Sequence, residues 1–261
     1  MSRGNRPPFA KKSLGQNFLV DPNYVRKIVA AADLERGDTI IEIGPGRGAI
    51  TESLVETGAN VIAIELDREL APQLAERFRA ARNFCVIEAD ATQVDFSNLI
   101  SGGPQFKVVA NLPYYISTAI LQHLAAQREH FVSLVLMFQK EVVDRISAPP
   151  GNSERGFLTV LTELAFSVER LFDVPPNAFR PTPKVTSTVA RLTPKPKSNI
   201  NEDDFRDLVS IAFSQKRKTI LNNLKSKYPD AREKLERCGI EASRRAESLS
   251  REEWALLLQS L

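Results

Sequence analysis

Four consecutive residues, Asn111-Leu112-Pro113-Tyr114, combine groups that could hold a planar aromatic amine. The side chain of Asn111 offers a carbonyl oxygen as a hydrogen-bond acceptor. Leu112 can offer its backbone carbonyl, and Pro113 stiffens the loop that presents it. Tyr114 adds a flat ring on which a base can stack. Acceptors on both N–H bonds of an exocyclic amine favour the pyramidal geometry that frees its delocalised lone pair for methylation.

Such a site needs no general base, because the rate comes from positioning the reacting atoms and from electrostatics. An isolated match of this kind is more often an Asn-Pro turn with a packed tyrosine. The tetrapeptide therefore has to be weighed with the rest of the chain.

A glycine-rich segment from Gly44 to Ala49 follows the apolar run 39–43. Glycines at a strand end let the backbone approach a ligand closely. The segment also fits a dinucleotide-binding fingerprint, so it could belong to a nicotinamide or flavin enzyme. It could equally be a strand-to-helix turn that needs glycine and binds nothing. Glu65 ends the next apolar run and Asp90 follows the one after it. They could accept hydrogen bonds from ribose hydroxyls and an adenine amine, respectively.

Each acid taken alone could be a helix N-cap. Three strand ends at the carboxyl edge of one sheet form a single crevice, which indicates an adenosine-containing cofactor. With this crevice beside the tetrapeptide, adenine N-methylation becomes the favoured chemistry, since a dehydrogenase has no use for Asn111 to Tyr114.

The elements that must position these residues are short apolar strands alternating with helices. We expect strands at 39–43, 60–65, 84–88, 106–110 and 132–138, with helices at 48–56 and 68–80. This pattern predicts an α/β, Rossmann-like, mostly parallel sheet covered on both faces. Two later strands, 167–174 and 186–192, are joined by a proline-rich segment that cannot be a helix. They predict an antiparallel pair at the sheet edge.

A polar, proline-containing stretch near residue 195 predicts a domain boundary. We expect residues 1–195 to form the catalytic domain, with a basic arm and cofactor motif in 1–20, and 196–261 to form a helical domain. Helices are predicted at 203–213, 216–227, 230–237 and 251–261, the last with a capping box from Ser250 to Glu253.

Composition narrows the class of protein. The chain has 261 residues and a net charge of +3, which is mildly basic. Cys85 and Cys238 lie far apart, and His123 and His130 are the only histidines, so we expect no disulfide framework and no metal. We read His123 as a helix residue without chemistry. No apolar run has membrane-spanning length and no secretion signal is evident, so a cytoplasmic location is expected.

Five motifs in order resemble the bacterial rRNA adenine N6,N6-dimethyltransferases that modify small-subunit RNA. Besides the tetrapeptide, they are 12–19, 42–48, 178–185 and 213–224. The resemblance covers nearly the whole chain. Thr182 stands where the family usually has proline and Lys216 where it has arginine, and neither departure touches the proposed chemistry.

The resemblance implies S-adenosylmethionine as cofactor and a pair of adjacent adenosines, in a hairpin loop near the 3′ end of 16S rRNA, as substrate. Each adenosine would receive two methyl groups. The implied cofactor contacts are Asn17, Leu19, Gly44, Gly46, Glu65, Asp90, Ala91 and Asn111. The implied catalytic residues are Asn111, Leu112, Pro113, Tyr114 and Phe179, with Phe179 closing on the target base opposite Tyr114.

Residues 214–227 carry basic side chains and no acid, which predicts contact with RNA phosphates through Lys216, Arg217, Lys218 and Lys225. A solvated helix face is the commoner explanation for such a run. Three alternatives stay open: an antibiotic-resistance methyltransferase of large-subunit RNA, a mainly non-catalytic assembly factor of the small subunit, and a nicotinamide oxidoreductase. The partner expected here is the immature small ribosomal subunit, bound by a monomer.

Overall fold

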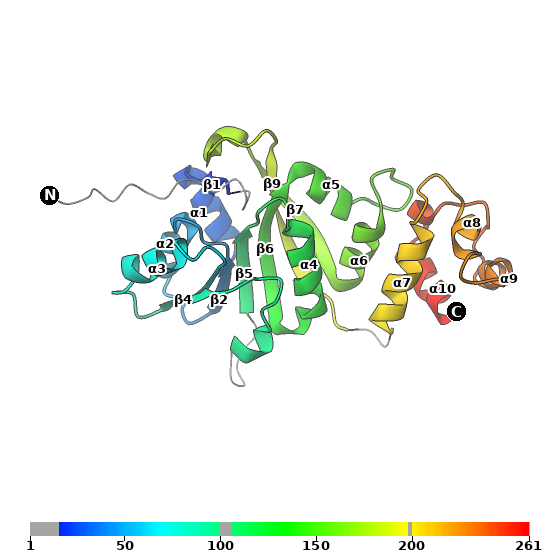
Figure 1. The fold of residues 1–261 in the computed structure, drawn as a ribbon, viewed down its shortest axis with the longest axis horizontal. Helices are drawn as coiled ribbons and strands as arrows, with labels where there is room; N and C mark the ends of the chain where they lie inside the picture. Colours follow the sequence, from blue (N-terminus) through cyan, green and yellow to red (C-terminus); the bar gives the residue numbers. More distant parts are fainter. Residues whose placement is uncertain (1–15, 100–105, 198–199, 261) are drawn as a thin grey trace. The chain divides into compact units, whose positions relative to one another are not determined.

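The computed structural model describes residues 16–99, 106–197 and 200–260. The basic residues of the predicted N-terminal arm up to Lys12 and the first part of motif 12–19 lie outside them. The chain folds into two compact units, 1–140 with 169–194 and 141–168 with 195–261. Figure 1 labels the elements of both units.

A seven-stranded sheet forms the centre of the first unit, in the order β4-β3-β2-β5-β6-β9-β7. The strands are β2 (Thr39–Ile43), β3 (Asn60–Glu65), β4 (Phe84–Glu88), β5 (Phe106–Asn111), β6 (Phe131–Gln139), β7 (Phe166–Val174) and β9 (Ser187–Pro194). From β4 to β6 all neighbours are parallel, whereas β9 runs antiparallel to β6. The predicted mostly parallel sheet with antiparallel edge strands is confirmed.

The strand order reverses between β2 and β5, because β3 and β4 lie on one side of this pair and β6 on the other. In an open α/β sheet, ligands bind outside the carboxyl ends of the strands at such a switch point. Gly44 follows β2 directly and Asn111 ends β5. The topology therefore brings the glycine segment and the tetrapeptide to the same place.

Helices flank the sheet: α1 (Pro22–Ala31), α2 (Ala49–Glu56), α3 (Leu70–Arg77) and α4 (Ser117–Ala126), the last drawn in front of β6 in Figure 1. Buried side chains of α1 and α2 share one core with apolar residues of β2, β3, β5 and β6. Short 3-10 turns occur at Phe96–Leu99, Arg128–His130 and Pro176–Ala178. His123 lies in α4, as expected, and its Nε2 is 2.7 Å from the Val94 carbonyl oxygen.

A small second sheet pairs β1 (Phe18–Leu19) with β8 (Phe179–Arg180). The two strands are antiparallel, and Leu19 lies opposite Phe179. The backbone N–H of Val20 donates to the carbonyl of Ala178 over 2.9 Å, which extends this contact. The N-terminal cofactor motif and the late loop are therefore held side by side, although they are distant in sequence.

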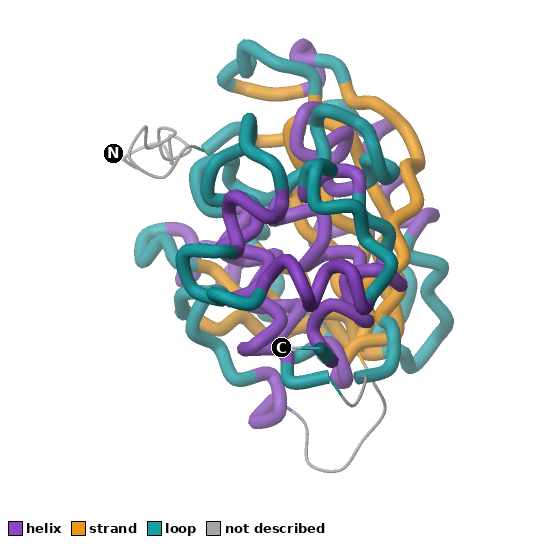
Figure 2. Tube along the Cα trace, turned by 90° about the vertical axis from the view of Figure 1, so that its right-hand side faces the viewer, coloured by secondary structure: helices purple, strands orange, loops and turns teal. Residues whose placement is uncertain are grey.

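The second unit contains α5 (Lys140–Ile146) from Glu141 onward, α6 (Phe157–Ala165), α7 (Glu202–Ala212), α8 (Ile220–Leu224), α9 (Ala231–Arg237) and α10 (Arg251–Gln259), with a 3-10 turn at Ala246–Ser248. In Figure 2 the chain leading to its C-terminus is made of helices and loops. The capping box of Ser250 and Glu253 is present at α10. The predicted helix 216–227 is too long, because residues 214–219 form turns and Thr219 caps a helix of five residues.

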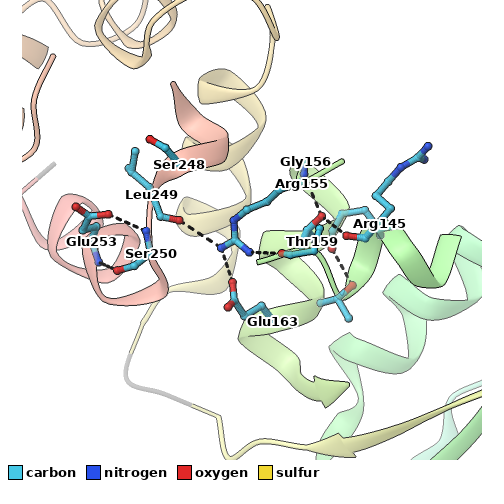
Figure 3. A network of polar contacts seen from close by, with 12 residues as sticks. Arg145, Arg155, Gly156, Thr159, Glu163, Ser248, Leu249, Ser250 and Glu253 are labelled. Atoms are coloured by element: carbon cyan, nitrogen blue, oxygen red, sulfur yellow. Dashed lines mark hydrogen bonds and ion pairs between the residues drawn. The ribbon is translucent and has the colours of Figure 1, made fainter. Parts of the chain in front are cut away.

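The predicted boundary near residue 195 did not anticipate that residues 141–168 group with the C-terminal helices. Val160 and Leu164 of α6 share a core with Phe205 and Trp254. Arg155 is 1% exposed. Its guanidinium donates to the Glu163 carboxylate over 2.6 Å and to the Ala148 and Leu249 carbonyls (Figure 3). A buried charge needs such partners, and they join the two segments of this unit.

Candidate active site

A cavity at the carboxyl edge of the sheet collects most of the predicted site residues. The empty space of this cavity, counted out to the open solvent at its mouth, is about 750 Å³. Its lining residues include Asn17, Gly44, Gly46, Glu65, Asp90, Ala91, Asn111, Leu112, Pro113 and Tyr114. Residues from the ends of β2, β3, β4 and β5 thus meet at one site, as the crevice hypothesis expected.

The glycine segment needs its glycines for conformational and steric reasons. Gly44 and Gly46 have φ angles of 69° and 58°, in the left-handed region that side chains disfavour. A Cβ atom on Gly46 would lie 3.0 Å from the ring of Phe18, which is tighter than normal packing. The turn therefore lets β1 approach the loop directly.

Glu65 is nearly buried at the end of β3 and holds the glycine loop. Its Oε2 accepts a hydrogen bond from the backbone N–H of Gly46 over 3.0 Å, and its Oε1 accepts one from Asp67 over 2.9 Å. Burial raises the pKa of Glu65 above its usual value. The two backbone donors lower this pKa, and the neighbouring Asp67 carboxylate raises it, so the pKa stays raised. The carboxylate faces the cavity in a position to accept hydroxyl donors of a ribose.

Asp90 lines the cavity after β4, and both of its carboxylate oxygens accept hydrogen bonds, Oδ2 from the side-chain nitrogen of Gln93 over 3.5 Å. Its Oδ1 accepts from both the N–H and the hydroxyl of Thr92, over 2.9 and 2.7 Å. Asp90 thus stabilises the turn that follows it, but no helix begins there, so it is not the helix N-cap considered as the alternative, and it also lines the cavity. Ala91 is buried next to it.

Glu42 is a buried acid under the glycine loop. The hydroxyl of Thr51 donates to its Oε2 over 2.6 Å. Burial raises the pKa of Glu42 to about 8, so this side chain is mostly protonated at pH 7. Together with Leu19 and Asn111 it lines a smaller cavity, which shares Phe18, Gly44, Gly46 and Asn111 with the main one.

The tetrapeptide is fixed by contacts on both sides. The side-chain nitrogen of Asn111 donates to the carbonyl of Asn17 over 3.1 Å. The backbone N–H of the buried Leu112 donates to Met137 over 3.3 Å. The hydroxyl of Tyr114 lies 2.8 Å from Ser187 Oγ. Burial raises the pKa of Tyr114, so it presents a neutral ring and not a phenolate.

Phe179 does not occupy the predicted position. Its side chain is 0% exposed and belongs to the core beneath β1, with Leu19 and Val25. The cavity lining, as far as the described residues go, contains Tyr114 but not Phe179. In this structure the ring anchors β8 against β1, since an aromatic side chain facing the core is more stable there than in water.

Sequence reasoning missed several residues of the site. Gln16 donates to the Asp67 carboxylate over 3.1 Å and so connects the N-terminal segment to the end of β3. Leu66 and Tyr115 also line the cavity. Gln16 lies inside motif 12–19 and Asp67 two residues after Glu65, which are usable signals. The contact of Tyr114 with Ser187 joins residues far apart in sequence and has no local signal.

Comparison with known proteins agrees with this geometry. The model of the family described as ribosomal RNA adenine dimethylase matches residues 9–261. The chain belongs to the ribosomal RNA adenine dimethylase family. The ribosomal RNA small subunit methyltransferase A of Saccharophagus degradans is 42% identical over 97% of this chain and 94% of its own. The protein of the same description from Moorella thermoacetica is 44% identical over 96% and 92%.

Two solved structures are similar to this chain in fold. A dimethyladenosine transferase from Plasmodium falciparum has a TM-score of 0.79 at 30% identity, over 93% of this chain and 96% of that one. The 23S rRNA methyltransferase ErmE has a TM-score of 0.71 at 25% identity, over 94% and 99%. This dimethylase is an S-adenosylmethionine-dependent enzyme that acts on ribosomal RNA.

The residues of the cavity fit that cofactor. The Glu65 carboxylate, which two backbone N–H groups hold in place, can accept hydrogen bonds from ribose hydroxyls. The glycines at positive φ have no side chains, so the loop beside Glu65 leaves room for the cofactor. When bound, S-adenosylmethionine supplies a methyl group on a positively charged sulfur. The carboxylates of Glu65, Asp67 and Asp90 give this region a negative field that favours a cation. The part of the chain described here has no cluster of metal-ligating side chains and no helix that could span a membrane.

Proposed function

We propose that this enzyme methylates N6 of two adjacent adenosines in a hairpin loop near the 3′ end of 16S rRNA, with two methyl groups on each. The observation that carries the proposal is the single cavity that joins Glu65 and Asp90 to the Asn111–Tyr114 tetrapeptide. The curated relatives named small subunit methyltransferase A, matched over nearly their whole length, support the small subunit as substrate.

In this proposal Asn17, Leu19, Gly44, Gly46, Glu65, Asp90, Ala91 and Asn111 hold the cofactor. Asn111 also accepts a hydrogen bond from the target amine, and the Leu112 carbonyl accepts the second. The neutral ring of Tyr114 stacks on the adenine. No residue has to remove a proton before transfer, because the ammonium product loses its proton readily to water. Catalysis then comes from holding nitrogen, methyl carbon and sulfur in line.

Recognition of the RNA falls to the exposed cations Lys216, Arg217, Lys218 and Lys225 of the second unit. Their side chains extend from the turns before α8 and from its end. Unlike Lys227, which pairs with Asp207 over 3.2 Å, they have no acidic partner among the described residues. The immature small subunit is the partner in this proposal, and a monomeric enzyme acts on it in the cytoplasm during subunit assembly.

The test is to incubate the protein and methyl-labelled cofactor with separated, unmethylated ribosomal subunits and to map the modified positions. Label in two neighbouring adenosines near the 3′ end of 16S rRNA is the expected result. Label only in large-subunit RNA would overturn the proposal in favour of the activity named for ErmE. RNA binding without any transfer would favour a non-catalytic assembly factor.

A further inference from the structure

Tyr115 is an aromatic side chain that the proposed chemistry does not use. It lines the cavity beside Tyr114, yet 54% of it is exposed to solvent. Scattered exposed apolar residues are normal on a protein surface and need no function. Tyr115 differs from them, because its exposed ring also lines the cavity that contains the tetrapeptide.

The local backbone explains why the two tyrosines differ. The N–H of Ile116 donates to the carbonyl of Pro113 over 3.2 Å and closes a four-residue turn. Tyr114 and Tyr115 are the two central residues of this turn, and only Tyr115 is exposed. Tyr114 is half-buried and held by Ser187. The Tyr115 hydroxyl has no hydrogen-bond partner among the described residues, so its ring is free to take a contact from outside.

We propose that Tyr115 stacks on the nucleotide next to the adenosine that is being methylated. The inference rests on the proposed function, in which the target is one of two adjacent unpaired adenosines. When one base stacks on Tyr114 in the cavity, the next nucleotide of the RNA has the exposed ring of Tyr115 beside it. Aromatic stacking is tolerant of base identity but is stronger for purines than for uracil. Tyr115 therefore makes the enzyme favour a purine neighbour.

The experiment compares unmethylated small subunits that carry adenosine, guanosine or uridine beside a single remaining target adenosine. For the unaltered enzyme we expect kcat/KM with either purine to exceed that with uridine by roughly tenfold. Tyr115→Ala should remove this preference by lowering the purine values to the uridine value. Tyr115→Phe keeps the ring and should retain the preference. Val132→Ala, at a comparably exposed apolar residue of β6, is the matched control and should change nothing.

The outcomes separate the possible roles. An equal loss on all three RNAs in Tyr115→Ala would overturn the inference, since the residue would then act on the target base or on the turn itself. Unchanged kinetics would also overturn it. Calorimetric titration with S-adenosylmethionine should give the same Kd for each variant, and a weaker Kd would show that the turn has been disturbed. If the unaltered enzyme labels no adenosine in small subunits, the proposed function fails first, and this inference falls with it.

Discussion

The side-chain amide nitrogen of Asn111 lies 3.1 Å from the backbone carbonyl oxygen of Asn17 and donates a hydrogen bond to it. A carbonyl oxygen can only accept, so this contact determines which end of the amide is the nitrogen. The carbonyl oxygen of Asn111 must then face away from Asn17. The N-terminal segment thereby orients the acceptor that the target amine requires.

Replacing Asn111 tests this orientation. We expect Asn111→Ala to lower kcat for methyl transfer by roughly 10²–10³-fold, as the loss of one transition-state hydrogen bond does elsewhere. Asn111→Asp keeps an acceptor but cannot donate to Asn17, and its charge repels that carbonyl, so it should be similarly impaired. Single-turnover rates with saturating RNA measure both. An active aspartate variant would show that the contact with Asn17 is dispensable.

The two carboxylates Glu65 and Glu88 lie opposite each other in register on β3 and β4 and should behave differently. Glu65→Gln places an amide nitrogen against one of two backbone donors, Gly46 or Asp67, and should weaken S-adenosylmethionine binding by roughly 10–100-fold. Glu88 forms an exposed ion pair with Arg68, so Glu88→Gln should leave the Kd unchanged. Calorimetry measures both, and equal affinities for the two variants would contradict the role given to Glu65.

Glu42 predicts a dependence of stability on pH. Its pKa is raised from 4.5 to about 8 in the folded state, so the unfolded chain loses this proton first as pH rises. The fold is therefore destabilised between about pH 4.5 and 8, by at most roughly 1.4 kcal/mol per pH unit. Glu42→Gln cannot ionise and should gain free energy of unfolding relative to the parent from pH 5 to 8. Urea denaturation at several pH values measures this, and a constant difference would show that Glu42 ionises normally.

How far the sequence could predict the structure depends on how local each signal is. The bounds of β2, β3 and β4 match the expected ranges, because each strand is a short apolar run between polar residues, although the edge strand β4 is less buried than the other two. The helix expected at 216–227 failed for a nonlocal reason. The amide of the buried Asn223 donates to the carbonyls of Ala212 and Gln215, which holds the preceding residues in turns.

The candidate site shows the same difference between features with a local sequence signal, which could be predicted, and long-range contacts, which could not. Its strand-end acids and glycines were predictable, because topology alone brings the carboxyl ends of parallel strands together. The contacts that orient them were not, since Tyr114 meets Ser187 and Gln16 meets Asp67 across long stretches of chain. Phe179 illustrates a third case: its motif was recognised, but a motif does not say whether a side chain faces the cavity or the core.

Phe179 can be tested by separating its packing from its aromatic character. Phe179→Ala should lower the free energy of unfolding by about 3–5 kcal/mol, because the ring is fully buried. Phe179→Leu fills much of the same space and should retain stability, cofactor binding and methyl transfer. Thermal denaturation and single-turnover kinetics measure these properties. A leucine variant that is stable and binds cofactor but transfers no methyl group would restore Phe179 as a wall of the base pocket.

The exposed cations before α8 should contribute to RNA binding through charge alone. Replacing Lys216, Arg217 and Lys218 by glutamine should weaken binding and reduce the slope of log affinity against log salt by up to about 2–3, since each phosphate contact releases counterions. With saturating RNA, kcat should not change, because none of the three lies in the first unit, which holds the cavity. Lys227→Gln is the matched control, as Lys227 already pairs with Asp207. Filter binding of small subunits at several salt concentrations measures the slope, and an unchanged slope would identify these side chains as an ordinary solvated surface.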